Sequence, residues 1–302
     1  MATVNKRIYK PQAMVINGVN QGGLMQARIQ EGYDTILRSS PDGLQVPLVD
    51  KYTAFCRGSI TSQDWVEAYN LLTGTLGTLV FYERKSAVAE ATGYIKHTIT
   101  NPVIHRISFS LNKDGYATVT FDFECKAADE AKTFTDMHAP TDSQNVPTYV
   151  TAARGGMRVI STLHAALAVY HVTAFTFNMA LKLVKDSNDG DLGYTVVDAL
   201  LDGLACDGSI TFQDGSISTA KLLAQQLMAA ARGSLVLTVR QGSAAANQVI
   251  TIAGVDFTTI GVDSDADADF NSHTANFIIS NDTTTQLTLA GVNKILAIAA
   301  AA

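Results

Sequence analysis

Four aspartates at alternating positions have the spacing most suggestive of a metal site. They are Asp263, Asp265, Asp267 and Asp269. Carboxylates at positions 1, 3 and 5 begin a calcium-binding loop, which also requires glycine at position 6 and an acidic ligand at position 12. Here those two places hold Ala268 and Thr274. The mismatch predicts a solvated acidic loop, which would face an aqueous channel if the protein encloses one, and leaves calcium binding as the weaker alternative.

Histidines suggest a second kind of chemistry, metal binding or proton transfer. Two pairs are close in the sequence, His97 with His105 and His164 with His171. None of the four has a cysteine or carboxylate at the spacing of a metal ligand. His105 also falls in an alternating strand pattern, where its side chain would face a neighbour or solvent. We therefore predict no metal ligand among them.

Serine catalysis and phosphate binding lack their usual motifs. Ser59 and Ser209 occur in a repeated phrase, but no GxSxG elbow surrounds either of them. We interpret both hydroxyls as helix-capping or turn groups. The segment NGVNQGG at 17–23 has too few glycines for a dinucleotide or phosphate loop and is expected to be a turn. The sequence thus predicts no catalytic residue, no cofactor-binding residue and no enzyme activity.

The repeated phrase itself is the strongest signal in the chain. RGSITSQD at 57–64 returns as DGSITFQD at 207–214, with a shift of 208 − 58 = 150 residues. Further along, GTLVFYER at 77–84 is matched by GSLVLTVR at 233–240, with a shift of 233 − 77 = 156 residues. Because the second anchor supports the first, we infer an internal duplication of about half the chain.

A helix is predicted between the two anchors of each copy. In the first copy, apolar residues recur every three to four positions from Val66 to Leu76, after a capping pattern that begins at Asp64. In the second copy, the pattern from Ser218 to Gly233 predicts a longer helix. The change in shift between the anchors is then an insertion within one helix.

The remainder of each copy reads as antiparallel strands. Val119, Phe121 and Phe123 alternate with polar residues, and Asp114-Gly115 is a hairpin signal. Further strands are predicted at 25–37, 93–100, 103–111, 173–184, 247–262, 273–280 and 284–291, in addition to the GSIT phrase and the Leu-Val anchor of each copy. We therefore predict a mainly β fold with one helix per repeat (α+β), built as two tandem antiparallel β-sandwich or partial-barrel domains. The predicted boundaries are 1–135 for the first domain, 136–157 for a linker and 158–302 for the second domain.

Composition and charge exclude several function classes. The chain has 302 residues, of which 47% are hydrophobic and only 17% charged, so it can bury a large core and much surface against partners. Residues 1–150 hold 14 basic and 15 acidic side chains, and residues 151–302 hold 8 and 13, which together give the net charge of −6. No basic stripe favours nucleic-acid binding. We expect no membrane span and no signal core.

The cysteines are Cys56, Cys125 and Cys206, without CxxC spacing. Cys56 and Cys206 fall at equivalent positions of the repeat. We predict buried, reduced thiols, which suit assembly in a reducing cytoplasm.

In these features the chain resembles the tail tube proteins of tailed bacteriophages. The resemblance is carried, once per half, by the GSIT phrase, the following helix and the G(T/S)LV strand. It implies a structural virion protein with six tube domains per ring, hence a trimer with pseudo-sixfold symmetry, and rings stacked into a conduit for DNA. The acidic balance would give a lumen that does not retain phosphate. The polar loops at 38–47 and 185–193 are the expected contacts between rings.

The resemblance also implies partners and leaves alternatives open. The chain would contact itself and other tail proteins (tape measure, terminator, and baseplate or distal tail protein), while DNA passes without specific binding and no membrane is involved. It would be assembled in the host cytoplasm and reside in the virion tail. The alternatives are a distal tail or baseplate ring protein of the same fold, and a carbohydrate-binding β-sandwich adhesin.

Overall fold

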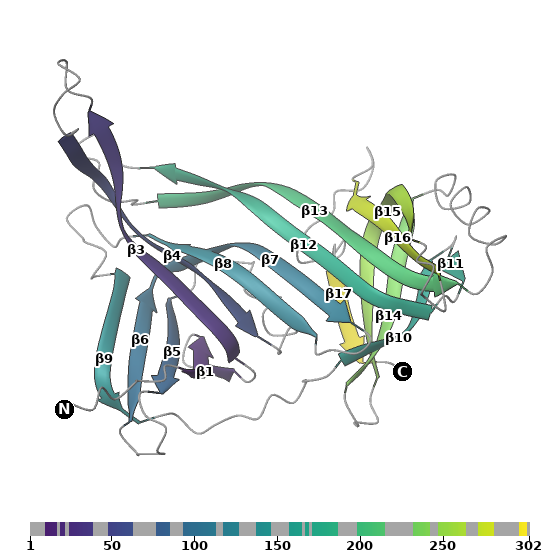
Figure 1. Cartoon of the computed structure of the whole chain (residues 1–302), viewed down its shortest axis with the longest axis horizontal. Coiled ribbons are helices and arrows are strands. Elements are labelled where there is room, and N and C mark those ends of the chain that lie inside the picture. Colours follow the sequence, from purple (N-terminus) through teal and green to yellow (C-terminus); the bar gives the residue numbers. More distant parts are fainter. Residues whose placement is uncertain are drawn as a thin grey trace, which may run out of the picture.

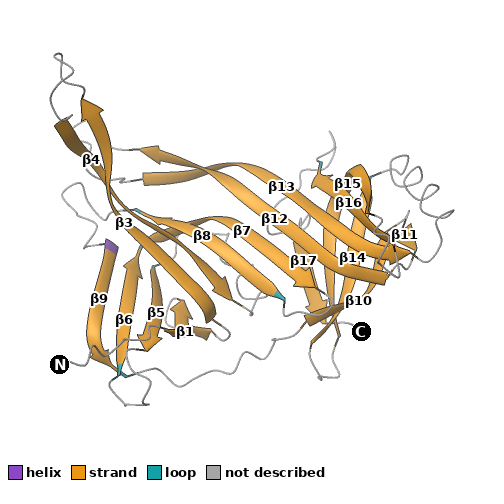
Figure 2. Ribbon diagram, viewed as in Figure 1, coloured by secondary structure: helices purple, strands orange, loops and turns teal. Residues whose placement is uncertain are grey.

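The computed structural model of the chain is built from β-strands (Figures 1 and 2). It describes residues 10–16, 19–21, 24–38, 48–62, 77–84, 93–112, 117–126, 137–145, 157–164, 167–168, 171–186, 198–214, 232–241, 247–263, 271–280 and 296–300. Both predicted helices lie outside these residues, so the prediction of one helix per repeat stays a prediction. Within the described part of the chain, no helix is long and apolar enough to cross a bilayer.

Among the described residues, the first half of the chain contributes nine strands. They are β1 (Lys10–Ile16), β2 (Val19–Gln21), β3 (Leu24–Arg38), β4 (Leu48–Ser62), β5 (Thr78–Arg84), β6 (Tyr94–Thr100), β7 (Pro102–Asn112), β8 (Thr118–Cys125) and β9 (His138–Gln144). The second half contributes eight more. They are β10 (Met157–His164), β11 (Leu167–Ala168), β12 (His171–Asp186), β13 (Asp198–Asp214), β14 (Gly233–Gln241), β15 (Asn247–Asp263), β16 (Asn271–Ile279) and β17 (Leu296–Ala300).

The strands form two sheets. The smaller has the order β2-β1-β5-β6-β9, and the larger has the order β11-β10-β14-β15-β16-β13-β12-β7-β8-β4-β3, with β17 paired to β15. All pairings are antiparallel, and the larger sheet passes from one half of the chain to the other where β7 meets β12 (Figure 1). The predicted mainly β, antiparallel class is therefore confirmed. Two separate tandem domains are not confirmed, because one sheet runs through both halves.

The two halves repeat the same pairing scheme. The long hairpin β3–β4 corresponds to β12–β13, and β8 and β16 pair with the second strand of each hairpin. In the first half the chain turns between β6 and β7 at Asn101, whose φ is 48°; in the second half β15 is continuous and bends at Gly254, whose φ is 70°. The amide of Lys126 donates to the carbonyl of Asn101, and the amide of Ser280 donates to that of Gly254. The corner is thus the same in both halves.

A core of aromatic and aliphatic side chains fills the space behind the larger sheet. In β8, Val119 and Phe121 are fully buried and Phe123 is 1% exposed, so the predicted alternation is confirmed. The same pattern buries Phe175, Phe177 and Met179 in β12. The smaller sheet covers the first half of this core with residues such as Met14, Leu79, Phe81 and Ile99.

Two features of the chain differ from what its sequence suggested. Ser59 and Ser209 do not cap helices or make turns; each lies inside a strand, β4 or β13, opposite Arg28 and Thr176 respectively. The GSIT phrase itself is strand in both halves, as predicted; only the capping or turn role of its serines is wrong. Strand β9 lies within the range predicted as linker, 136–157, and pairs with β6. The proposed domain limits themselves stay a prediction.

Candidate functional site

The sequence candidates for metal chemistry are not brought together by the described structure. The acidic loop lies outside the described residues except for Asp263, which ends β15. His164 and His171 belong to β10 and β12, and His105 interrupts the pairing of β7 with β8 between Ile104 and Arg106. Among the described residues, no group of three or more His, Cys, Asp or Glu side chains could hold a metal ion.

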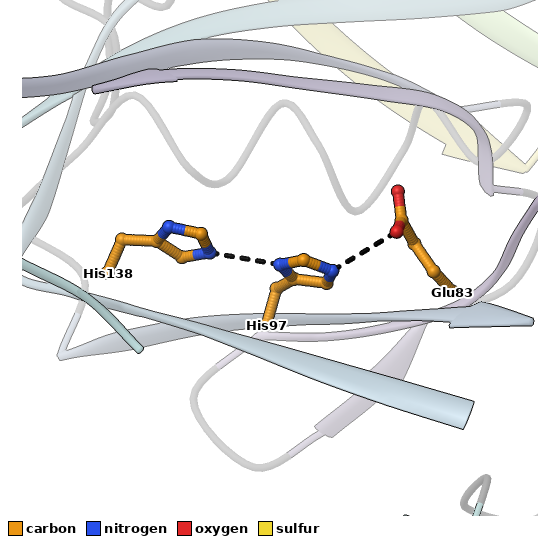
Figure 3. Close-up of polar contacts among 3 residues, drawn as sticks. All are labelled: Glu83, His97 and His138. Carbon is orange, nitrogen blue, oxygen red and sulfur yellow. Dashed lines mark hydrogen bonds and ion pairs between the residues drawn. The ribbon is translucent and has the colours of Figure 1, made fainter. Parts of the chain in front are cut away.

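His97 instead belongs to a hydrogen-bonded chain of four side chains, from three strands of the smaller sheet and one of the larger. Figure 3 shows three of the four, Glu83, His97 and His138. Glu83 Oε2 lies 3.2 Å from His97 Nε2, and His97 Nδ1 lies 3.0 Å from His138 Nε2. His138 Nδ1 lies 2.7 Å from Glu31 Oε2, on β3 of the larger sheet. The rings of Phe81, His97 and His138 stack in succession. The chain of contacts therefore ties the two sheets together.

The donors and acceptors in this chain follow from the chemistry of its side chains. A carboxylate only accepts, so His97 donates from Nε2 to Glu83 and His138 donates from Nδ1 to Glu31. The bond between the rings then needs a third proton, which neutral rings do not have to spare. Burial lowers the pKa of His97, against the opposing pull of Glu83, and the neighbouring His138 lowers it further. A neutral His97 that carries its proton on Nε2 fits both this lowered pKa and the hydrogen bond to Glu83.

What this cluster can do is limited by what surrounds it. A cavity of about 960 Å³ adjoins it, lined by residues of both sheets that include Glu31, Glu83, His97 and His138. The cluster contains no nucleophile, and we assign it a structural role as a polar tie across the core. The sequence does not reveal this cluster, because Glu31 and His138 are 107 residues apart and the residues of β9 fall in the predicted linker.

The outer face of the larger sheet is a band of polar side chains bonded from strand to strand. Side-chain hydrogen bonds join Thr61 to Thr120 (2.9 Å), Thr176 to Ser209 (2.7 Å), Asn178 to Asp207 (3.0 Å), Thr211 to Thr274 (3.1 Å) and Asn276 to Thr259 (2.8 Å). Most of these groups are uncharged, and the arginines on this face share it with Asp122 and Asp207.

The joint between the halves is a strand pair, β7 with β12. It runs in register from Arg106 opposite Ala180 to Asn112 opposite Ala174. On the core side, the rings of Phe109 and Phe177 stack across it with centroids 6.4 Å apart. This joint is strong because the backbone groups of both strands are hydrogen-bonded to each other and the aromatic side chains are buried.

Two sheet edges equivalent to this joint have no described partner. β3, the counterpart of β12, pairs only with β4, and residues 256–263 of β15, the counterpart of β7, pair only with β16 among the described strands. Open edges are sites at which another strand can add. The larger sheet thus carries two open strand edges, on β3 and on residues 256–263 of β15, which correspond to the two strands that pair in the internal joint.

The three cysteines are buried and free, as the sequence predicts. Cys56 and Cys125 are neighbours, and their hydrogen bond together with burial raises the pKa of the Cys125 thiol. Burial raises the pKa of Cys206 to about 12. The thiols of Cys125 and Cys206 therefore lack the lowered pKa of a nucleophile.

Comparison with known proteins adds a single assignment. The sequence model of a family described as phage tail tube protein matches residues 42–291, which is most of the chain. A comparison with curated proteins gives no significant match.

Proposed function

This chain belongs to the phage tail tube protein family and is thus a structural tail protein of the virion, and on that premise we propose that it forms the stacked rings of a tail tube. Each ring would hold three chains, with six equivalent lobes around a channel that conducts DNA. Such a role needs no catalytic site, and tail tube proteins are a structural kind of protein.

The observation that carries this proposal is the pair of open edges. A head-to-tail contact between unlike surfaces generates a closed ring if the rotation at each step divides the circle. The internal joint supplies one such step between two similar lobes. Repeating that step between chains would give every lobe the same neighbours, which favours an even number of lobes. Three chains give the six lobes that the family resemblance implies.

The polar face of the larger sheet supports the role of a conduit. If this face lines the channel, it presents hydroxyl and amide groups that are already bonded to one another. Such a wall would stay hydrated and would bind the phosphate backbone of DNA only weakly. The proposal that the lumen is acidic rests on the net charge of −6 of the whole chain. On the polar face itself, the positive charges of Arg28, Arg57 and Arg106 partly neutralise the carboxylates.

Assembly with other tail proteins belongs to the same proposal. The chain would stack on itself and meet the tape measure, terminator and distal tail or baseplate proteins after synthesis in the host cytoplasm. The polar loops at 38–47 and 185–193 are proposed as contacts between rings; they lie almost wholly outside the described residues.

Negative-stain microscopy of the purified protein, with mass photometry of the same sample, tests the function. Hollow rods of uniform width are the expected result. Rings that stop at one layer would identify a distal tail or baseplate component instead. If the protein stays monomeric at every concentration and binds immobilised glycans, the tube proposal is wrong and the adhesin alternative is supported.

A further inference from the structure

We propose that β3 of one chain pairs with residues 256–263 of β15 in a second copy, in the register already set by β12 and β7. This inference rests on the proposed function and specifies the contact between chains. It places Gln30 opposite Gly261, Ile29 opposite Val262 and Glu31 opposite Ile260 of the neighbouring copy.

The register follows from matching the two halves strand by strand. On the first edge, Ser59 lies opposite Arg28 as Ser209 lies opposite Thr176, so Arg28 corresponds to Thr176 and Gln30 to Asn178. Both strands also have a register shift just before these residues, between Leu24 and Gln26 in β3 and between Val172 and Ala174 in β12. The correspondence is therefore fixed by irregularities as well as by residue type.

The second edge is matched in the same way. Ile104 lies opposite Phe123 as Phe257 lies opposite Phe277, and in both strands the register shifts at the next residue. Counting onward, Ser108 of β7 corresponds to Gly261 of β15. Because Asn178 lies opposite Ser108 in the internal joint, Gln30 is placed opposite Gly261 in the joint between chains.

Side chains on the open edge of β3 are less buried than their counterparts on β12, as expected if β3 lacks its partner strand. In β12, covered by β7, Phe175, Phe177 and Met179 are 2%, 1% and 0% exposed. Their counterparts in β3 are Ala27, Ile29 and Glu31. Ala27 and Ile29 are only partly buried against the core, and the Glu31 side chain is 39% exposed. The cavity beside Glu31 borders this same edge.

The occupant we assign to this edge is a second copy rather than another protein. The chain itself carries the matching strand, with the same bulge and with Ile260 packed against the core as a partly buried residue. Adding that strand would cover Ile29 and bury the carboxylate of Glu31 together with its partner His138, which lies 2.7 Å away. The buried carboxylate then already has a hydrogen-bond partner, as burial requires.

Paired cysteines test the register directly. Opposed residues of an antiparallel pair have Cα atoms about 4.5–5.5 Å apart, within the range of a disulfide. Gln30→Cys combined with Gly261→Cys should form disulfides between chains on mild oxidation of the assembled protein. The products should be species of two and three chains, including a closed covalent ring, and reduction should return them to single chains.

Matched pairs control for geometry and accessibility. Asn178→Cys with Ser108→Cys occupies the equivalent place in the internal joint and should form a disulfide within one chain. Gln30→Cys with Asn276→Cys places the second thiol on the same face but on β16, diagonal to Gly261 and more than about 10 Å from residue 30, and should not cross-link. Each variant must assemble under reducing conditions, as judged by microscopy.

The outcomes separate the inference from the function. Tubes in which the Gln30–Gly261 pair stays unlinked while the internal control links would overturn the register and leave the tube intact. Absence of any assembly in the unmodified protein would overturn both. If the variants fail to fold, a density map of the unmodified tube shows the strand pairing directly. A map in which β3 pairs with any strand other than β15 of the neighbouring chain would contradict the proposal.

Discussion

Gly208 on β13 lies directly opposite Phe277 on β16, and Gly58 on β4 lies opposite Phe123 on β8 in the same relationship. At each glycine a Cβ would collide with the opposed phenyl ring and with a carbonyl oxygen of the neighbouring strand. The glycine of the repeated GSIT phrase is therefore present to admit an aromatic ring. The phrase recurs because the same packing problem is solved twice.

Replacing either glycine with alanine should destabilise the chain. Gly58→Ala and Gly208→Ala each force backbone or ring to shift, and we expect a loss of about 2–3 kcal/mol in the free energy of unfolding. Urea denaturation of the unassembled protein measures this loss. Gly261→Ala is the matched control, because its nearest neighbour would be 4.0 Å away. Equal stability of all three variants would refute the packing explanation.

The two corners make a second prediction. Asn101 and Gly254 both have positive φ, a conformation that most side chains avoid and that asparagine and glycine tolerate. Gly254→Ala should cost about 1–2 kcal/mol, whereas Asn101→Gly should be close to neutral. Thermal melts of the pair decide it, and a corner that accepts alanine without loss would contradict the argument.

The pH dependence of stability should report on His97. Burial lowers its pKa below the ordinary value of about 6.5. In the window just below that value the unfolded chain binds a proton that the folded chain does not, so stability falls as the pH falls. His97→Gln can still donate to Glu83 and accept from His138 but cannot titrate. Its melting temperature should fall less than the wild type between pH 7 and pH 5; identical slopes would rule out His97.

Thiol labelling tests the description of the core. Burial raises the pKa of Cys206 to about 12, and the pKa of Cys125 is raised as well. At pH 8 these thiols are protonated and covered, so a thiol reagent should react with the folded chain far more slowly than with the denatured chain. Rapid labelling of any of the three cysteines in the folded protein would show that the core opens readily.

Much of the sheet structure could be predicted because it follows from short patterns. Alternation gave the strand containing Phe121, and the two anchors gave the duplication, since period-two patterning is local information. The capping reading of Ser59 failed because the polar residues after it suggested a helix start. In fact the phrase forms an inner strand whose polar side faces outward.

The histidine cluster and the open edges could not be read from the sequence. Glu31 and His138 meet only because β9 joins the smaller sheet and faces β3, a pairing that no local pattern specifies. Likewise the sequence gives no sign that β7 pairs with β12 rather than leaving the halves separate. Long-range pairing is set by the whole fold, so it appears only with the structure.

Cryo-electron microscopy of the assembled protein tests the central claim most directly. We predict a hollow tube of stacked rings, each made of three chains that present six similar lobes, with the larger sheet continuous from one chain to the next. Compact particles of a single chain, or an assembly without a central channel, would contradict the account.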